Sequence, residues 1–206
     1  MIEFELTPIF PTVLCSFFLE EGVEGLYEEI INKTSFVETD YGGGSQISVN
    51  NNVLDKWKTL KDQIENGFLM FKDNVLSLKT TNFKMTTSWM TKTPPNCGSQ
   101  KHLHKNSYYS GVLYLTEHFD QSPIMFFNPN ESKNSILTNS PDEFNSLNSQ
   151  TWSIHPEKNK VILFPSYLEH LVRVNLSPDD RYSIAFNFFP FGKIGTNDAQ
   201  IELIYE

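Results

Sequence analysis

The sequence contains few cysteines. Only two occur in its 206 residues, Cys15 and Cys97, and they form no Cys-x-x-Cys pair. A disulfide framework needs more cysteines than this, so the chain is typical of a protein that folds in a reducing compartment. We interpret both residues as ordinary, partly buried thiols.

The sequence also lacks long apolar runs and an excess of basic residues. No run approaches the roughly 20 apolar residues of a transmembrane helix. The opening "MIEFELTPIF" is acidic where a signal peptide would be basic. The 16 Lys and Arg residues are outnumbered by 25 Asp and Glu residues, which gives a formal net charge of -9. This charge disfavours a membrane surface or a nucleic acid as the main partner, and we expect a soluble cytoplasmic protein.

Helical patterns are confined to the first part of the chain. Residues 20–33, "EEGVEGLYEEIINK", have apolar residues at helical spacing, and residues 54–76 form the clearest helix, with Leu54, Trp57, Leu60 and Ile64 on one face. The preceding "IEFELTPIFPTVLCSFF" predicts strands interrupted by prolines, and "YGGGSQISVNNN" predicts a flexible break.

From residue 81 onward the patterns indicate short β-strands. The strand-like runs are "FKMTTSWMTKT", "YYSGVLYL", "PIMFF", "VILFPSYLEHLVRV", "RYSIAFNFF" and "IELIYE". Between them, residues 128–153 are rich in Asn and Ser and predict a long surface loop, of the kind that often closes over a site. We expect a single domain over residues 1–206, in which residues 1–80 supply strands and supporting helices around a β-sandwich or barrel formed by residues 81–206.

Two histidines stand two residues apart in "QKHLHKNSYYSGVLYL". If this stretch is extended, His102 and His104 point to the same side. The same parity continues through Asn106, Tyr108, Ser110, Val112 and Tyr114. Such a face is polar for a protein core, which is typical of a binding site. The alternative is a polar loop with two solvated histidines.

His170 and Arg181 lie near the ends of two later strand-like runs. Arg181 is the eleventh residue after His170, and the turn-like "NLSPDD" lies between them, so we predict a hairpin that brings them near each other. Arg181, Ser183, Ala185 and Asn187 would share one face. Burying the charge of an arginine is costly unless an anion pairs with it, and the planar guanidinium can donate two parallel hydrogen bonds to a carboxylate. The alternative is an ion pair of Arg181 with Glu169 or Asp180 at the sheet edge.

Together these residues predict a metal centre beside a carboxylate clamp. Imidazole ligands suit iron, zinc or copper, and two histidines with one further ligand are typical of non-haem Fe(II) oxygenases. His118 and His155 have no partner at ligand spacing, so we assign them to the surface. We expect Trp89 and Trp152 to lie in the core, and Tyr114 and Ser183 could also simply pack.

Two longer stretches carry a resemblance to a known family. Residues 88–115, "SWMTKTPPNCGSQKHLHKNSYYSGVLYL", and residues 163–195, "LFPSYLEHLVRVNLSPDDRYSIAFNFFPFGKIG", resemble a group of Fe(II)- and 2-oxoglutarate-dependent oxygenases found in bacteria and bacteriophages. The N-terminal "PIFPTVLCSFFLEE" and the helix at 54–76 are also similar, so the resemblance covers nearly the whole chain. If the chain is viral, its compartment would be the host cytoplasm.

The resemblance implies a mainly β fold with flanking helices, the double-stranded β-helix or cupin-like jelly-roll barrel. It implies that His102, His104 and His170 bind Fe(II), and that Arg181 grips 2-oxoglutarate with help from Ser183 and Tyr114. The reaction would use O2 to convert 2-oxoglutarate to succinate while a second substrate is hydroxylated. The 128–153 loop and the turn at 94–100 would frame that substrate, which the sequence leaves open as a small metabolite, a protein side chain or a nucleobase.

One departure and two alternatives stay open. Most of the superfamily have an acid two residues after the first histidine, whereas this chain has His104, so the ligand set could include a carboxylate from elsewhere. A second interpretation takes His104 as the first ligand and Asn106 as the residue in the place of the acid.

The chain could instead be a three-histidine, cupin-like dioxygenase that needs no 2-oxoglutarate, or a non-catalytic jelly-roll protein with a binding or structural role. A homodimer is compatible with the sequence.

Overall fold

The computed structural model describes residues 3, 5, 7, 9–20, 22–39, 42–117, 120, 122–130 and 141–205. Its elements are, in chain order, β1 (Cys15–Phe18), α1 (Gly25–Lys33), β2 (Phe36–Glu38), β3 (Gln46–Ser48), the 3-10 helix η1 (Val53–Lys56), α2 (Lys58–Asn74), β4 (Asn82–Thr93), β5 (Tyr109–Tyr114), β6 (Ile124–Phe127), β7 (Thr151–Ile154), β8 (Lys160–Pro165), β9 (His170–Val172), β10 (Arg181–Ile194), the 3-10 helix η3 (Asn197–Ala199) and β11 (Ile201–Leu203). In the described ranges, no helix is long and apolar enough to cross a membrane.

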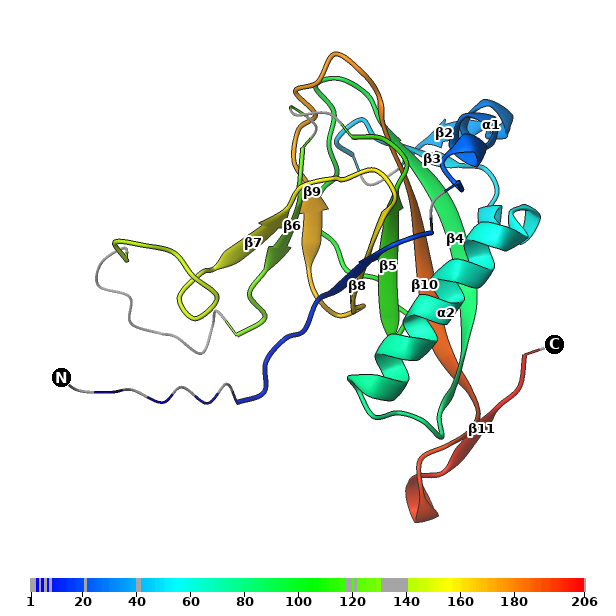
Figure 1. Ribbon diagram of the computed structural model, residues 1–206, viewed down its shortest axis with the longest axis vertical. Helices are drawn as coiled ribbons and strands as arrows, with labels where there is room; N and C mark the ends of the chain where they lie inside the picture. Colours follow the sequence, from blue (N-terminus) through cyan, green and yellow to red (C-terminus); the bar gives the residue numbers. More distant parts are fainter. Residues whose placement is uncertain are drawn as a thin grey trace.

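Two antiparallel sheets form the body of the molecule (Figure 1). The larger sheet has the strand order β1-β8-β5-β10-β4-β3-β2, and β11 pairs with the far end of β10. The smaller sheet has the order β7-β6-β9. The predicted mainly β architecture with flanking helices is therefore confirmed.

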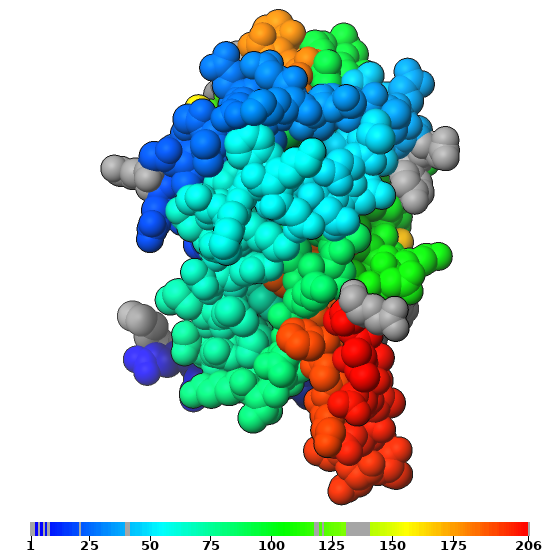
Figure 2. All heavy atoms as spheres, turned by 90° about the vertical axis from the view of Figure 1, so that its right-hand side faces the viewer, coloured from blue at the N-terminus to red at the C-terminus, as the bar shows by residue number. Residues whose placement is uncertain are grey.

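Helix α2 covers the outer face of the large sheet (Figures 1 and 2). Its buried apolar residues recur at helical spacing, at Leu60, Ile64, Phe68 and Phe71. The Phe68 ring stacks on Phe188 of β10, with 3.9 Å between ring centroids. This packing anchors the central strands on which the polar residues of the interior are mounted.

Strand β10 serves two faces because its side chains alternate. Ile184, Phe186 and Phe188 belong to the core under α2. The residues between them point to the opposite face of the sheet, toward the smaller sheet. A second apolar cluster fills part of that interior, and it consists of Val112, Tyr114, Ile124, Phe126, Ile162, Phe164 and Leu168.

Three details differ from the sequence-based expectations. The predicted break at 41–52 contains strand β3, which pairs with both β2 and β4. The predicted helix at 54–76 starts as the 3-10 turn η1, and the α-helix begins only at Lys58. The predicted loop 128–153 ends earlier, because β7 begins at Thr151 and pairs with β6. Residues 131–140 of that loop lie outside the described residues.

Candidate metal centre and anion site

Strands β4, β10 and β5 form the floor of the site. The register of the strands sets their inward-facing residues side by side in four rows, which are Thr93–Arg181, Thr91–Ser183–Tyr114, Trp89–Ala185–Val112 and Thr87–Asn187–Ser110. A β-bulge follows directly after Asn187. Bulges are frequent beside functional sites because they redirect neighbouring side chains.

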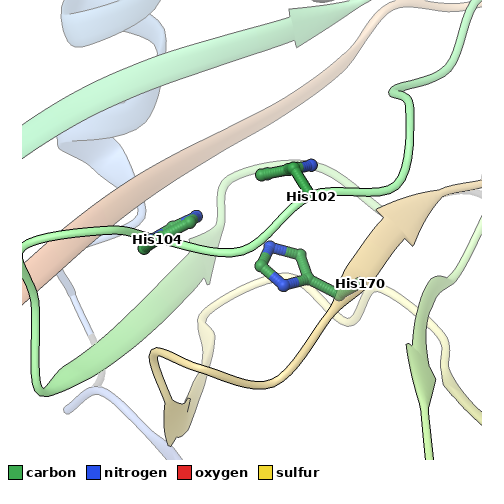
Figure 3. Close-up of side chains that lie close together, drawn as sticks. All are labelled: His102, His104 and His170. Atoms are coloured by element: carbon green, nitrogen blue, oxygen red, sulfur yellow. The ribbon is translucent and has the colours of Figure 1, made fainter.

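The three predicted histidines lie together above this floor (Figure 3). His102 and His170 face each other across an antiparallel bridge, in which each backbone N–H donates to the other's carbonyl at 2.9 Å. The backbone N–H of His104 donates to Ser166 O at 3.1 Å. The segment around His102 is thus extended, as predicted, and both its histidines point to one side.

The rings are close enough to share one ion. Ring centroids are 4.4 Å apart for His102 and His170, 5.1 Å for His104 and His170, and 5.6 Å for His102 and His104. One ring nitrogen from each residue lies within 4.8 Å of the others. Among the described residues, this group of potential metal ligands contains no carboxylate.

Hydrogen bonds fix which ring nitrogen is available. The Nδ1 atoms of His102 and His170 lie 2.8 Å from Gln100 O and 2.9 Å from Leu168 O. The Nδ1 atom of His104 lies 2.7 Å from Asn187 Oδ1. A carbonyl oxygen can only accept, so Nδ1 carries the proton in each ring and Nε2 keeps its lone pair for a metal. The donor set therefore fits a divalent transition metal.

Burial keeps two of these histidines neutral. It lowers the pKa of His104 to about 4, against a smaller opposite effect of the bond to Asn187. Burial and the neighbouring His102 lower the pKa of His170 to about 3. Neutral imidazole is the form that binds metal, so both rings are ready as ligands at neutral pH.

Arg181 forms an anion site at the other end of the floor. Its side chain is only 1% exposed, and its guanidinium lies 5.1 Å from the centroid of the Tyr114 ring. Nη1 donates to Ser183 Oγ in a long contact of 3.4 Å. Neither Arg181 Nε nor the Tyr114 hydroxyl has a hydrogen-bond partner, although both are buried. Buried polar atoms without partners are costly, and an anion placed between them would satisfy both.

The proposed pairing of Arg181 with a neighbouring acid is wrong. Glu169 pairs with Lys101 at 2.8 Å, and Asp180 pairs with Lys92 at 3.0 Å. Arg181 is therefore left without a carboxylate in the described part of the chain. Burial disfavours its charge and lowers its pKa, which an anionic ligand would reverse.

One cavity of about 670 Å³ joins the histidines to Arg181. Ser183, Ala185 and Asn187 line it, so the predicted shared face is confirmed. Trp89 also lines it, with its ring 5.3 Å from that of His104. The expectation that Trp89 belongs to the core is wrong, because odd-numbered residues of β4 face the cavity in this stretch.

Other predictions about the site need correction. His170 and Arg181 do not form a hairpin, because β9 pairs with β6 in the small sheet whereas β10 pairs with β4 and β5. The parity beyond His104 breaks at a turn where Asn106 has a φ of 58°, so Asn106 and Tyr108 are exposed rather than in the site. The parse that uses Asn106 as a ligand is thereby wrong.

The remaining aromatic and histidine predictions concern the surface. Trp152 is 48% exposed on β7, so its assignment to the core is wrong. His155 is exposed, as predicted. His118 lies outside the described residues.

Comparisons with known proteins agree with this geometry. A family described as "Putative 2OG-Fe(II) oxygenase" matches residues 87–187. That range contains the three histidines, Tyr114, Arg181, Ser183 and Asn187. A search of curated protein sequences found no match.

Solved structures with the same fold include two prolyl hydroxylases. A prolyl-4-hydroxylase from Pseudomonas putida is 17% identical, with a TM-score of 0.57 over 86% of this chain and 92% of that chain. A prolyl hydroxylase from Trichoplax adhaerens, in complex with a hypoxia inducible factor peptide fragment, is 16% identical, with a TM-score of 0.62 over 85% and 83% of the two chains. HygX from Streptomyces hygroscopicus, with nickel, 2-oxoglutarate and hygromycin B bound, is 11% identical, with a TM-score of 0.58 over 87% and 83%. The predicted jelly-roll fold is confirmed.

Proposed function

The chain belongs to the family of 2OG-Fe(II) oxygenases, and we propose that it is an Fe(II)- and 2-oxoglutarate-dependent dioxygenase that hydroxylates a second substrate. One observation carries the proposal: three histidines whose Nε2 atoms are available share a cavity with Arg181, a buried arginine that forms no ion pair with an acid of the described residues. The first feature fits a divalent metal and the second fits a carboxylate, and 2-oxoglutarate links the two because it has a carboxylate at each end.

Each residue of the site has a role in this proposal. His102, His104 and His170 hold the metal through Nε2. Arg181 binds the distal carboxylate of 2-oxoglutarate, Ser183 supports the guanidinium, and the Tyr114 hydroxyl donates to the same carboxylate. When bound, Fe(II) supplies the O2 chemistry that oxidatively decarboxylates 2-oxoglutarate to succinate and CO2 and oxidises a C–H bond of the second substrate.

The side of the cavity next to β3 and β4 is our candidate for the second-substrate site. Trp89, Ile47 and Asn51 line the cavity there. Ser99, from the predicted framing turn at 94–100, lies at the same cavity. We also propose that residues 1–206 act as one domain, because β1 pairs with β8 and α2 packs on the strands that carry the site.

A three-histidine dioxygenase that does not use 2-oxoglutarate is the second candidate. The absence of a carboxylate from the histidine group, among the described residues, favours it. The orphaned Arg181 favours our proposal instead, because an enzyme without a carboxylate co-substrate has no use for a buried cation at this place. The match to an oxygenase family disfavours a non-catalytic jelly-roll protein.

Succinate formation distinguishes the two candidates. We expect the Fe(II)-loaded protein to convert 2-oxoglutarate slowly to succinate even without its second substrate, and we expect Arg181→Ala to abolish this turnover. Arg173→Ala is the matched control, because Arg173 lies outside the cavity lining, and it should retain wild-type turnover. Succinate formation that survives Arg181→Ala, or is absent from the iron-loaded wild-type protein, would contradict the proposal.

A further inference from the structure

Asn187 contacts the metal site through His104 and not through the metal itself. Its Oδ1 accepts from His104 Nδ1 at 2.7 Å and from Ser110 Oγ at 2.8 Å, and its Nδ2 donates to Thr87 Oγ1 at 3.0 Å. The amide is therefore fixed by Thr87 and Ser110, its neighbours in one row of the floor, and by His104 above that row. His102 and His170 are held by backbone carbonyls instead, so only His104 depends on a side chain.

The orientation of this amide determines what His104 can do. With Oδ1 toward the ring, the proton stays on Nδ1 and Nε2 is free to bind a metal. With the amide reversed, an N–H would face Nδ1, the proton would move to Nε2, and the ring could not be a ligand through that atom. An asparagine at this place is thus able either to enable or to block the third ligand.

Two hydroxyls hold the amide of Asn187 in the productive orientation. Ser110 is fully buried, and its hydroxyl donates to Asn187 Oδ1 at 2.8 Å. The Thr87 hydroxyl accepts from Asn187 Nδ2 at 3.0 Å. Ser110 Oγ also lies 2.7 Å from Ser166 Oγ, but Ser166 donates to Ser107 Oγ, and Ser107 donates to the Tyr109 carbonyl. The proton of Ser110 is thus directed at Asn187 Oδ1, and an amide N–H at that place could not accept it.

We propose that Asn187 is a positioning residue that sets the Nδ1–H tautomer of His104, and that Ser110 and Thr87 hold its amide in place. This inference rests on the metal site of the proposed function. It explains why position 187 of "RYSIAFNFF" carries a side chain with an acceptor facing His104, whereas the Thr87 hydroxyl can either accept from an amide or donate to a carboxylate.

Nitrogen NMR of histidine-labelled protein tests the tautomer directly. In the metal-free wild-type protein at neutral pH, we expect the ring of His104 to carry its proton on Nδ1. In Asn187→Leu, which is similar in size but cannot accept, we expect the Nδ1–H signal of His104 to be lost while that of His170 persists. An Nε2–H tautomer of His104 in the wild-type protein would overturn the inference without reference to any variant.

Metal affinity provides the second readout, with Co(II) as the probe in competition with a chelator. Asn187→Leu should weaken binding by roughly 10- to 100-fold. Asn187→Asp keeps the acceptor and should stay within a few-fold of wild type, and Asn82→Leu on the exposed end of β4 is the matched control. Wild-type affinity in folded Asn187→Leu, or an equal loss in Asn187→Asp, would overturn the inference. A wild-type protein that binds no Co(II) would instead refute the proposed function, while the tautomer measurement would still decide the role of Asn187.

Discussion

Arg181 carries its charge where no acid of the described chain forms an ion pair with it. Its neighbours are the Tyr114 ring and the Ser183 hydroxyl. A buried charge without a counterion lowers stability, and it persists in a protein when a ligand needs it. Arg181 therefore favours the binding of an anionic ligand and lowers the free energy of unfolding of the ligand-free protein.

This trade-off can be measured with Arg181→Met. We expect the substitution to raise the free energy of unfolding of the metal-free, ligand-free protein by about 1–4 kcal/mol, since an apolar side chain replaces an unpaired charge of similar length. Urea unfolding in the presence of a chelator is the measurement, and Arg173→Met outside the cavity should be close to neutral. A marked loss of stability in folded Arg181→Met would mean that a counterion is already present in the ligand-free protein.

The buried histidines predict how stability depends on pH. Folding lowers the pKa of His104 to about 4 and that of His170 to about 3, so below pH 6.5 the unfolded chain binds protons that the folded chain does not. The free energy of unfolding of metal-free protein should thus fall as the pH falls from about 6.5 toward 4, by about 1.4 kcal/mol per unit for each histidine. Above pH 6.5 these residues contribute no pH dependence.

Comparison with a variant isolates this contribution. Urea unfolding at several pH values should give a slope for His104→Gln that is smaller by about one proton, whereas Asn82→Gln, at the exposed end of β4, should leave the slope unchanged. Equal slopes for the wild-type protein and His104→Gln would show that His104 is protonated in the folded state.

Among the strands, β5 and β10 lie so close together at Gly111 that this position has no room for a side chain. A Cβ added at Gly111 of β5 would lie 2.4 Å from the Phe186 ring and 2.9 Å from Ile162 O. Phe186 is fully buried under α2, so the ring has little room to move. This glycine lets the strand that carries Ser110 and Tyr114 lie flat against its neighbours.

Gly111→Ala should therefore destabilise the protein by about 1–3 kcal/mol through overpacking. Gly25→Ala, at the start of α1 where no atom lies within 4 Å of the added Cβ, is the matched control and should be neutral or slightly stabilising. Urea unfolding of both variants provides the comparison. A Gly111→Ala protein as stable as Gly25→Ala would show that β5 can shift without cost.

The same elements show what the sequence could predict and what it could not. Alternation of side chains is a local property of a strand, so the shared face of Arg181, Ser183, Ala185 and Asn187 could be predicted. Strand partners are not local. The turn-like "NLSPDD" is compatible with a hairpin, yet the chain crosses from the small sheet to the large one at this point.

The contact between His104 and Asn187 could not be predicted for the same reason. The two residues are separated by 83 positions, and no spacing rule links them. Trp89 was missed because an aromatic residue in a strand usually packs in a core. The parity of β4 relative to β10 would have placed it in the cavity, but that parity follows from the register, which the sequence did not reveal.

In the molecule as a whole, the two sheets contribute different parts of the site. The large sheet, backed by α2, carries the anion site and the support for His104, and the small sheet contributes His170 through β9 (Figure 1). The bridge between His102 and His170 joins the segment before β5 to the small sheet. The metal site thus requires both sheets, whereas the anion site requires only one.

The central claim is that one cavity holds Fe(II) and 2-oxoglutarate together. The most direct test is anaerobic titration of the metal-free protein with Fe(II) and then 2-oxoglutarate, followed by visible absorption, with Arg181→Ala and His104→Ala as variants and Arg173→Ala as the control. We expect a weak charge-transfer band that needs both additions, that is lost in the two site variants and that persists in the control. Iron binding without the band, or a band that survives Arg181→Ala, would contradict the account.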